Sequence, residues 1–347
     1  MSLTLIATTI KKYYSAFCIG VPAVPKEKNN QDNESVGEMH SPRLPSFFLI
    51  GAMKAGTTAL DAYLSQHPQI YMCPVKDGRF FWTDGENAPR FSDPFADQFR
   101  NGGILGFENY RSLFVVARSD QILGESTALY LSSPFAGQRI KERVPNAKII
   151  ILLRQPATRS YAHYLQAVRN GMEHLDFVSA LEAESWRIES GWGPTYHYIK
   201  RSFYVPQVNE YIKLFGADNI AFFLQEDLHR QPERTIHAIC EFIGAAKPDH
   251  LDFSVRHNVT RSPRYRRLSW LINRPDNLAI KALRDHLPAG IRKTLGAWNR
   301  NLLLADPPAL ERKLYDSLTD LFSQDILALE QIIHRDLKHW LVKSNAR

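Results

Sequence analysis

Residues 46–58 read SFFLIGAMKAGTT and decide the fold of this 347-residue chain. The apolar run at its start has the length of a buried strand, and a stretch of helical character, Thr58–His67, follows. Gly51 and Gly56 in the loop between them allow a sharp turn that brings backbone N–H groups close to a ligand. The N-terminus of the following helix favours negative charge. The stretch therefore predicts a strand, a loop and a helix that together bind a phosphate-like anion.

The loop has the G-x-x-x-x-G spacing of a nucleotide-binding P-loop, but its lysine lies at a different position. A nucleoside-triphosphate loop carries lysine directly after the second glycine, followed by a Ser or Thr that holds magnesium. Here Thr57 stands at that position, and the lysine lies inside the loop, at Lys54. The second strong strand candidate ends in Arg154 rather than in a metal-binding Asp. We therefore expect an anionic group that is bound without a metal ion.

Further apolar runs alternate with helical segments along the chain. Ala147–Leu153 and Ile220–Leu224 have the length and composition of buried strands. Helices are expected at Ala157–Arg169 and Pro232–Ile243. This alternation predicts an α/β protein with a P-loop-like three-layer fold, in which a central parallel sheet is flanked by helices. Apolar residues at helical spacing from Ala309 to Leu341 predict two further packed helices.

Composition excludes several classes of protein. The chain has 44% hydrophobic and 23% charged residues, which excludes a wholly disordered chain and a polytopic membrane protein. Its 43 Lys and Arg against 36 Asp and Glu give a net charge of +7. Cys18, Cys73 and Cys240 follow neither a disulfide nor a zinc-site spacing. They fit a reducing compartment, so we expect a cytoplasmic protein.

Residues 1–44 differ in character from the rest of the chain. The apolar run 13–24 follows two lysines, as in a signal peptide, but it is too short to span a membrane and contains Pro22. Residues 25–44 are polar and have no hydrophobic period, which is typical of a linker. We expect 1–44 to be a flexible extension, 45–347 to form the functional domain, and no stable membrane span.

Four ordered blocks resemble the PAPS-dependent sulfotransferase family of the bacterial and carbohydrate type. FFLIGAMKAGTTAL, with the later PVKDGRFF, resembles the loop that binds the 5′-phosphosulfate of 3′-phosphoadenosine 5′-phosphosulfate (PAPS). LLRQPATRSYAHY resembles the 3′-phosphate motif, and FFLQEDLHRQPERTIHAICEFIG and DILALEQIIHRDLKHWL resemble later blocks. The resemblance runs from about Pro45 to Leu341. It implies metal-free transfer of a sulfuryl group from PAPS to a hydroxyl or, as a second choice, an amine, by in-line displacement.

The resemblance implies a donor site with two cationic ends. The residues that would bind the 5′-phosphosulfate are Lys54, Ala55, Gly56, Thr57 and Thr58. Lys54 would also stabilise the charge that grows on the leaving phosphate oxygen. Arg154 would bind the 3′-phosphate, to which a bidentate guanidinium is suited. The family has a serine eight residues after this arginine, where this chain has Ala162. Arg261 and Arg264, in a basic run, are the candidates to replace that contact.

Asp77 is the candidate general base. In family members with the motif K-E-x-x-F-F, the Glu takes the proton of the acceptor, and this chain reads Lys76-Asp77-Gly78-Arg79-Phe80-Phe81. An Asp-Gly pair is also a common turn, so a purely structural role stays open. His67 and His163 are the alternative bases. Trp82 and the Phe203-Tyr204 pair belong either to an adenine site or to the core.

The block GESTALY resembles a segment that lines the acceptor cleft. Heparan-type members carry a lysine after its Glu, whereas Ser126 follows Glu125 here, which argues against a heparan-like polyanionic acceptor. Glu125 is therefore either a polar residue of the cleft or a satisfied buried carboxylate. The acceptor itself is not determined: a polysaccharide, a glycolipid, a sterol and a small metabolite all stay open.

Two other functions compete with this interpretation. A P-loop kinase or NTPase would share the glycine spacing, but the displaced lysine and the missing metal-binding Asp oppose it. A basic nucleic-acid-binding protein would fit the net charge and the basic run RHNVTRSPRYRR. The positive charge suits an anionic donor equally well. We therefore expect PAPS and an acceptor molecule as partners, and no nucleic acid.

Overall fold

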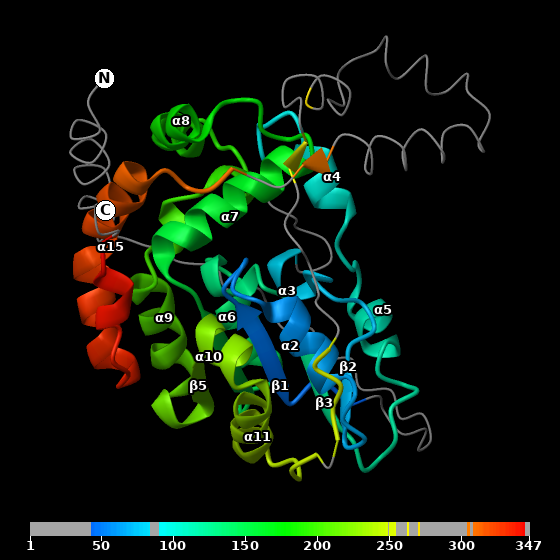
Figure 1. Ribbon diagram of the computed structural model, residues 1–347. Helices are drawn as coiled ribbons and strands as arrows, with labels where there is room; N and C mark the ends of the chain where they lie inside the picture. The colour runs from blue at the N-terminus through cyan, green and yellow to red at the C-terminus, as the bar shows by residue number, and fades with distance from the viewer. Residues whose placement is uncertain are drawn as a thin grey trace.

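The structure of the protein is a computed structural model, which describes residues 43–83, 90–248, 250–254, 262–263, 270, 304–305 and 308–343. In this part of the chain, five parallel strands form a central sheet in the order β2-β3-β1-β4-β5 (Figure 1). The strands are β1 (Phe47–Gly51), β2 (Ile70–Met72), β3 (Ile122–Ser126), β4 (Lys148–Leu153) and β5 (Ile220–Leu224). The three strands expected from sequence are β1, β4 and β5, with ends that agree to within one residue.

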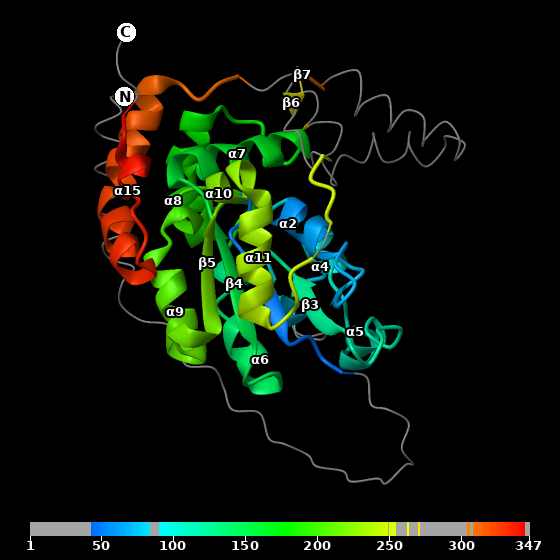
Figure 2. The ribbon, with the colours of Figure 1, turned by 60° about the horizontal axis from the view of Figure 1, so that its bottom comes forward.

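Helices cover both faces of the sheet. α2 (Thr57–Leu64) and α11 (Pro232–Ile243) pack together on one face, and α3 (Phe80–Thr83), α6 (Ala136–Arg143) and α9 (Val205–Phe215) group on the other (Figures 1 and 2). This arrangement follows from right-handed crossovers, because chain moving from β1 toward β2 and chain moving from β3 toward β4 must pass on opposite faces. It confirms the expected α/β, P-loop-like three-layer fold.

The carboxyl end of the sheet is covered by α7 (Pro156–Arg169), which starts directly after β4 and crosses above β1 in Figure 1. α15 (Arg312–Ile333) packs against α7 and α9. The other described elements are α4 (Ala96–Asn101), α5 (Phe107–Ser112), α8 (Phe177–Glu189), α10 (Gln225–Arg230), the 3-10 turns η2 (Tyr130–Ser132), η3 (Pro194–Tyr196), η4 (Lys200–Ser202), η5 (Ala217–Asn219) and η6 (Lys338–Leu341), and an antiparallel pair, β6 (Ser262–Pro263) and β7 (Leu304–Ala305).

β3 is a central strand, although its sequence, ILGES, lacks the apolar pattern that predicts a buried strand. Gly124 lies against the Phe47 ring, whose Cζ would be only 2.1 Å from a Cβ at this position, so no side chain fits there. Glu125 is fully buried, and its carboxylate accepts hydrogen bonds from the hydroxyls of Tyr110 (2.5 Å) and Tyr130 (2.6 Å), and from Thr127 (2.9 Å). Burial raises the pKa of Glu125, while these hydrogen bonds oppose the rise. Glu125 is therefore a satisfied buried carboxylate.

The expectation of two helices between Ala309 and Leu341 is wrong. One continuous helix, α15, occupies Arg312–Ile333, since its apolar positions keep helical spacing and no Gly or Pro interrupts them. It ends at His334, which adopts a left-handed conformation with φ 52°. The short turn η6 then completes the segment.

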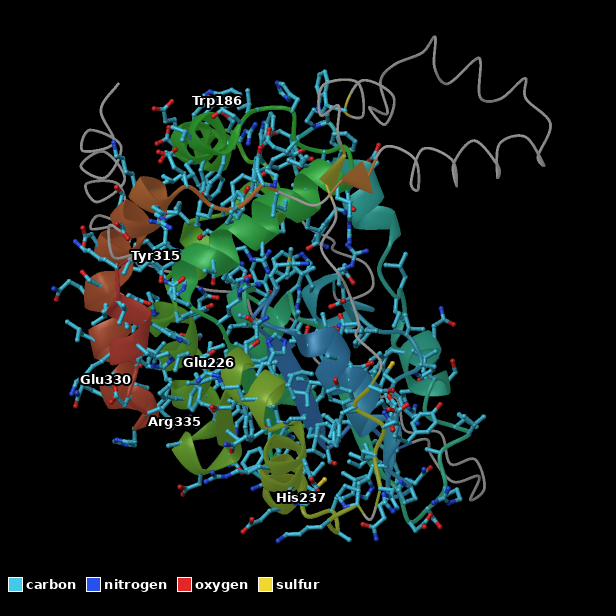
Figure 3. The ribbon with its side chains drawn as sticks, in the orientation of Figure 1. Trp186, Glu226, His237, Tyr315, Glu330 and Arg335 are labelled. Atoms are coloured by element: carbon cyan, nitrogen blue, oxygen red, sulfur yellow. The ribbon has the colours of Figure 1, made fainter. Side chains whose placement is uncertain are left out.

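The segment after α15 contacts α10 through its side chains. Glu226 accepts a 2.6 Å hydrogen bond from Trp340 Nε1 and lies 2.6 Å from His339 Nε2, while Arg335 pairs with Asp227 at 2.7 Å. Figure 3 shows Glu226 and Arg335 where the end of α15 faces α10. These contacts hold the first turn of α10, and with it Gln225, beside the cavity described next.

Candidate active site

A cavity of about 960 Å³ lies beside the loop after β1 and the residue after β4. Strands at the centre of a parallel sheet end at the same edge, and this edge is where open α/β sheets bind ligands. The cavity is lined mainly by the β1–α2 loop, the Lys76–Arg79 segment, α7 and the η3–η4 region, with Phe99, Ala128, Leu129 and Arg154 between them. Gln225 and His229 of α10 close one side.

The β1–α2 loop presents Lys54, Gly56, Thr57 and Thr58 to this cavity, as expected from sequence. Gly56, with φ 105°, is the N-cap of α2, so the free N–H groups of the first turn face the cavity. Ala55 differs, because its side chain is buried in the core and its N–H donates to Ala52 O at 3.0 Å. Of the five loop residues predicted to bind the donor, four therefore line the site.

Lys54 and Arg154 meet in this cavity. Arg154 Nη1 donates to the carbonyl oxygen of Lys54 at 3.0 Å, although 100 residues separate them in sequence. Arg154 Nε donates to Thr158 Oγ1 at 3.1 Å, and the hydroxyl of Tyr204 donates to Arg154 O at 2.7 Å. The loop after β1 and the tip of β4 thus meet at one cationic site, so the structure brings together the two cationic residues that sequence proposed for the donor.

Burial, followed by the charges of Arg169, Arg154 and Arg159, lowers the pKa of Lys54 from 10.5 to about 8. An ammonium held among three guanidinium groups without an acid partner is electrostatically unfavourable. An anion bound between these groups would relieve that repulsion. The electrostatics of the loop therefore indicate an anionic ligand.

Backbone strain is concentrated at the same place. In the described part of the chain, the non-glycine residues with positive φ are Lys54 (73°), Asp77 (55°), Arg79 (57°) and His334 (52°). The first three line the main cavity, and only His334 lies at a helix end. Left-handed conformations of such residues are unfavourable by about 1 kcal/mol or more and cluster at functional sites.

Asp77 is held at the cavity by the chain after β3. Its N–H donates to Ser126 O at 2.9 Å, and its Oδ1 accepts the N–H of Ala128 at 2.9 Å. Its Oδ2 pairs with Lys76 Nζ at 3.0 Å, and the side chain keeps 48% of its surface exposed. One carboxylate oxygen is thus fixed by the backbone, the other by Lys76, and the half-exposed carboxylate lines the cavity, where an acceptor hydroxyl can reach it as a general base requires.

Three arginines of the cavity escaped the sequence analysis: Arg79, Arg169 and Arg201. Arg201 is 5% exposed, and its Nε donates to Ser132 Oγ at 2.8 Å. The fully buried Arg159 ties η4 to α7 by donating to Tyr198 O (2.6 Å) and Ser202 Oγ (2.7 Å). Only Arg169 carried a sequence signal, because it lies seven residues after Ala162 and therefore on the same face of α7.

The two histidines considered as bases differ in their surroundings. His67 is a satisfied structural residue: Nδ1 accepts the N–H of Gln69 at 3.0 Å, and Nε2 lies 2.9 Å from Ala246 O. His163 lines the cavity, is 1% exposed, and neither ring nitrogen has a partner among the described residues. Burial, followed by the charge of Arg159, holds its pKa well below 6.5, so it is a neutral imidazole and a weak base.

Several other predicted residues lie away from the cavity. Trp82 packs edge-on against Phe99, and Phe203 packs edge-on against Phe322, so both belong to the core rather than to an adenine site. Ala162 is buried and does not line the cavity. Arg261 and Arg264 lie outside the described residues. Within the part of the chain that the structure covers, no cluster of three or more His, Cys, Asp or Glu residues could hold a metal ion, and no helix is long and apolar enough to cross a membrane.

A sequence model of the sulfotransferase family matches residues 45–249, more than half of the chain. The chain belongs to the sulfotransferase family. This membership confirms the resemblance found in sequence and favours a group-transfer enzyme over an NTPase or a nucleic-acid-binding protein.

Solved and curated relatives agree with this membership. A sulfotransferase from Alicyclobacillus acidocaldarius superposes with a TM-score of 0.66 at 29% identity, over 86% of this chain and 99% of the other. The membrane-associated sulfotransferase kil1 of Dictyostelium discoideum is 22% identical over 66% of this chain and 62% of its own length. A bifunctional heparan sulfate N-deacetylase/N-sulfotransferase 1 of Caenorhabditis briggsae is 24% identical over 61% of this chain and 24% of its own. The match therefore covers less than two thirds of either curated relative.

Proposed function

We propose that this sulfotransferase moves a sulfuryl group from PAPS to a hydroxyl, or as a second choice to an amine, of an acceptor molecule. The observation that carries the proposal is the meeting of Lys54 and Arg154, 3.0 Å apart from Nη1 to carbonyl oxygen, in one cavity of about 960 Å³. PAPS has anionic groups at both the 3′ and 5′ positions, so it requires cations from two parts of a fold. Membership of the family supports PAPS as the donor, and the positive charge of the site supports the binding of an anionic donor.

Each residue takes a role that its geometry permits. Arg154 binds the 3′-phosphate, and Lys54, Gly56, Thr57 and Thr58 bind the 5′-phosphosulfate. The acceptor oxygen forms the new bond to sulfur while the bond from sulfur to the 5′-phosphate oxygen breaks in line. Asp77 takes the acceptor proton, and Lys54 stabilises the charge left on 3′-phosphoadenosine 5′-phosphate (PAP).

We propose that this reaction needs no metal ion. In the described part of the chain, the main cavity is lined by Lys54, Lys76, Arg79, Arg154, Arg169 and Arg201, with Asp77 as the acid. Oxygen-rich sites for magnesium use carboxylates, and here the carboxylate is required as the base. Lys54 and Arg154, which bind the donor in this proposal, supply the positive charge that a metal provides in phosphoryl transfer.

The domain boundary and the location belong to the same proposal. Residues 45–347 form the sulfotransferase domain and 1–44 an extension to it. A reducing location such as the cytoplasm is supported by Cys73 and Cys240, which are both buried free thiols.

Transfer of radiolabelled sulfate from PAPS to components of a cell extract tests the function. We expect a labelled product and PAP with the wild-type protein, loss of turnover in Lys54→Ala, and weakened donor binding in Arg154→Ala. Lys141→Ala is the matched control, because Lys141 is a half-buried lysine whose Nζ contacts Pro145 O and the Phe215 ring and does not line the cavity. Magnesium-dependent binding of ATP tighter than the binding of PAP would overturn the proposal in favour of a P-loop NTPase.

A further inference from the structure

A smaller cavity of about 190 Å³ adjoins the main one. The residues that line both cavities are Arg79, Phe99, Met172 and Thr195. Asp93, Phe95 and Gly193 complete the smaller one, which we name the side cavity. Its aromatic and thioether walls and its volume suit one ring of a small molecule or one sugar unit. Because Arg79 follows Asp77 by two residues, the side cavity lies beside the proposed base.

Arg79 is held at the junction with unused hydrogen-bonding capacity. Its Nη1 donates to Phe99 O at 2.7 Å, and its guanidinium carbon lies 4.6 Å from the centre of the Phe99 ring. These contacts fix the plane of the guanidinium. Nε and Nη2 have no hydrogen-bond partner, and no carboxylate pairs with Arg79, among the residues that the structure describes. A planar cation fixed in this way can bind a carboxylate, sulfate or phosphate group.

The acid of the side cavity does not neutralise this arginine. Both carboxylate oxygens of Asp93 accept backbone N–H groups, from Phe95 at 2.9 Å and from Gly193 at 2.9 Å. Asp93 is 8% exposed, and a Cβ at Gly193 would lie 3.0 Å from its Oδ2, so the wall is tightly packed. Asp93 therefore has a structural role in the wall of the side cavity, and both of its oxygens already have hydrogen-bond partners.

Arg201 is a second arginine of the main cavity that has no carboxylate partner among the described residues. Arg201 makes its described contacts to Ser132 Oγ, Pro194 O and the sulfur of Met53, none of which is anionic. Burial lowers the pKa of Arg201 to about 9, and the charge of Asp77 opposes that effect, which places the two groups within electrostatic range. Asp77 is thus flanked by Lys76, Arg79 and Arg201. This part of the cavity has more positive charge than its own acid can balance.

We propose that Arg79, which lines the same main cavity as Arg201, forms an acceptor subsite for an anionic substituent, so that the acceptor carries a carboxylate, sulfate or phosphate near the hydroxyl that is sulfated. The inference rests on the proposed function and adds the chemical class of the acceptor. An anion bound at Arg79 offsets part of the positive field at Asp77 and so favours transfer of the acceptor proton to its carboxylate. A single anionic group meets this need, so the argument from Ser126 against a polyanionic acceptor is unaffected.

The test measures binding of two matched probes to protein saturated with PAP, which occupies the donor cations. The probes are phenyl β-D-glucuronide and phenyl β-D-glucoside, which differ in a carboxylate against a hydroxymethyl group. We expect the glucuronide to bind at least about tenfold more tightly to the wild-type protein, since a charge-assisted bidentate pair exceeds a neutral contact by this much. In Arg79→Gln the preference should fall to about one, with the affinity for PAP within twofold of wild type.

Arg118→Gln is the matched control, because Arg118 is an exposed arginine that pairs with Asp120 outside both cavities. It should keep both the preference and the affinity for PAP. Equal binding of the two probes, binding of neither at 20 mM, or an unchanged preference in Arg79→Gln would overturn the subsite. If the wild-type protein does not bind PAP at all, the proposed function itself fails, so the two failures are told apart by the first titration.

Discussion

Replacing Lys54 by arginine should abolish a proton uptake that accompanies donor binding by the wild-type protein. The pKa of Lys54 in the free protein is about 8, because burial and three neighbouring arginines disfavour its ammonium form. Relative to the ordinary lysine pKa of 10.5, this lowering means that the free protein disfavours the charged form of Lys54 by about 3 kcal/mol. The phosphates of PAP favour that form, so binding raises the pKa of Lys54 and draws a proton from solvent.

The size of this effect follows from the fraction of charged lysine. At pH 8 about half of the free protein carries neutral Lys54, so each PAP bound takes up about 0.5 proton. Between pH 7 and pH 9 the charged fraction falls from about 0.9 to about 0.1, so the affinity for PAP should fall about tenfold. The phosphates of PAP, with second pKa values of about 6, are fully ionised over this range and contribute little.

Isothermal titration calorimetry at pH 8 in two buffers of different ionisation enthalpy measures the proton uptake directly. Lys54→Arg keeps a positive charge at all these pH values, so its uptake should fall below about 0.1 proton and its affinity should stay flat with pH. The reasoning is refuted if the wild-type protein takes up no proton at pH 8, or if Lys54→Arg takes up as many.

Four further changes test other parts of the structure. Arg169→Gln should lower the affinity for PAP about tenfold, because Arg169 shares the α7 face of Ala162 and has no described partner. The affinity for 5′-AMP, which lacks the 3′-phosphate, should stay unchanged in the same titration. An equal loss of affinity for both nucleotides would show that Arg169 does not bind the 3′-phosphate. Asp77→Asn should keep PAP affinity and lower turnover at least about a hundredfold, since the amide cannot take a proton; normal turnover would move the base. Gly124→Ala should lower the free energy of unfolding by about 1–3 kcal/mol, measured by denaturant titration, because its Cβ would overlap the Phe47 ring at 2.1 Å. Burial raises the pKa of Asp325 in the folded state to about 6, so the folded protein binds this proton more tightly than the unfolded chain does. The free energy of unfolding should therefore fall by up to about 3 kcal/mol as the pH rises from 4 to 6. Asp325→Asn should flatten this dependence on pH, and an unchanged dependence would contradict the assignment.

The sequence predicted those elements of the fold whose hydrophobic pattern is local, within a few consecutive residues. β1, β4 and β5 are continuous apolar runs, and a strand buried on both faces needs nothing more to be recognised. β3 was missed because its Gly and Glu are explained only by distant residues, namely the Phe47 ring and the hydroxyls of Tyr110 and Tyr130. The C-terminal segment was divided in two because spacing marks a helical face but not whether one helix continues along it.

The sequence alone determined the prediction of an anion site at the loop holding Lys54, because glycine spacing, a helix start and a lysine are all local features. Only the tertiary structure decided how charged that site is, since Arg169 and Arg201 reach the cavity from segments more than 100 residues along the chain. It also decided that His163 is a neutral imidazole, because the burial and the arginines that hold its pKa down come from packing. Electrostatic energy depends on distance in space and on exclusion of water, and neither quantity can be read from the order of residues.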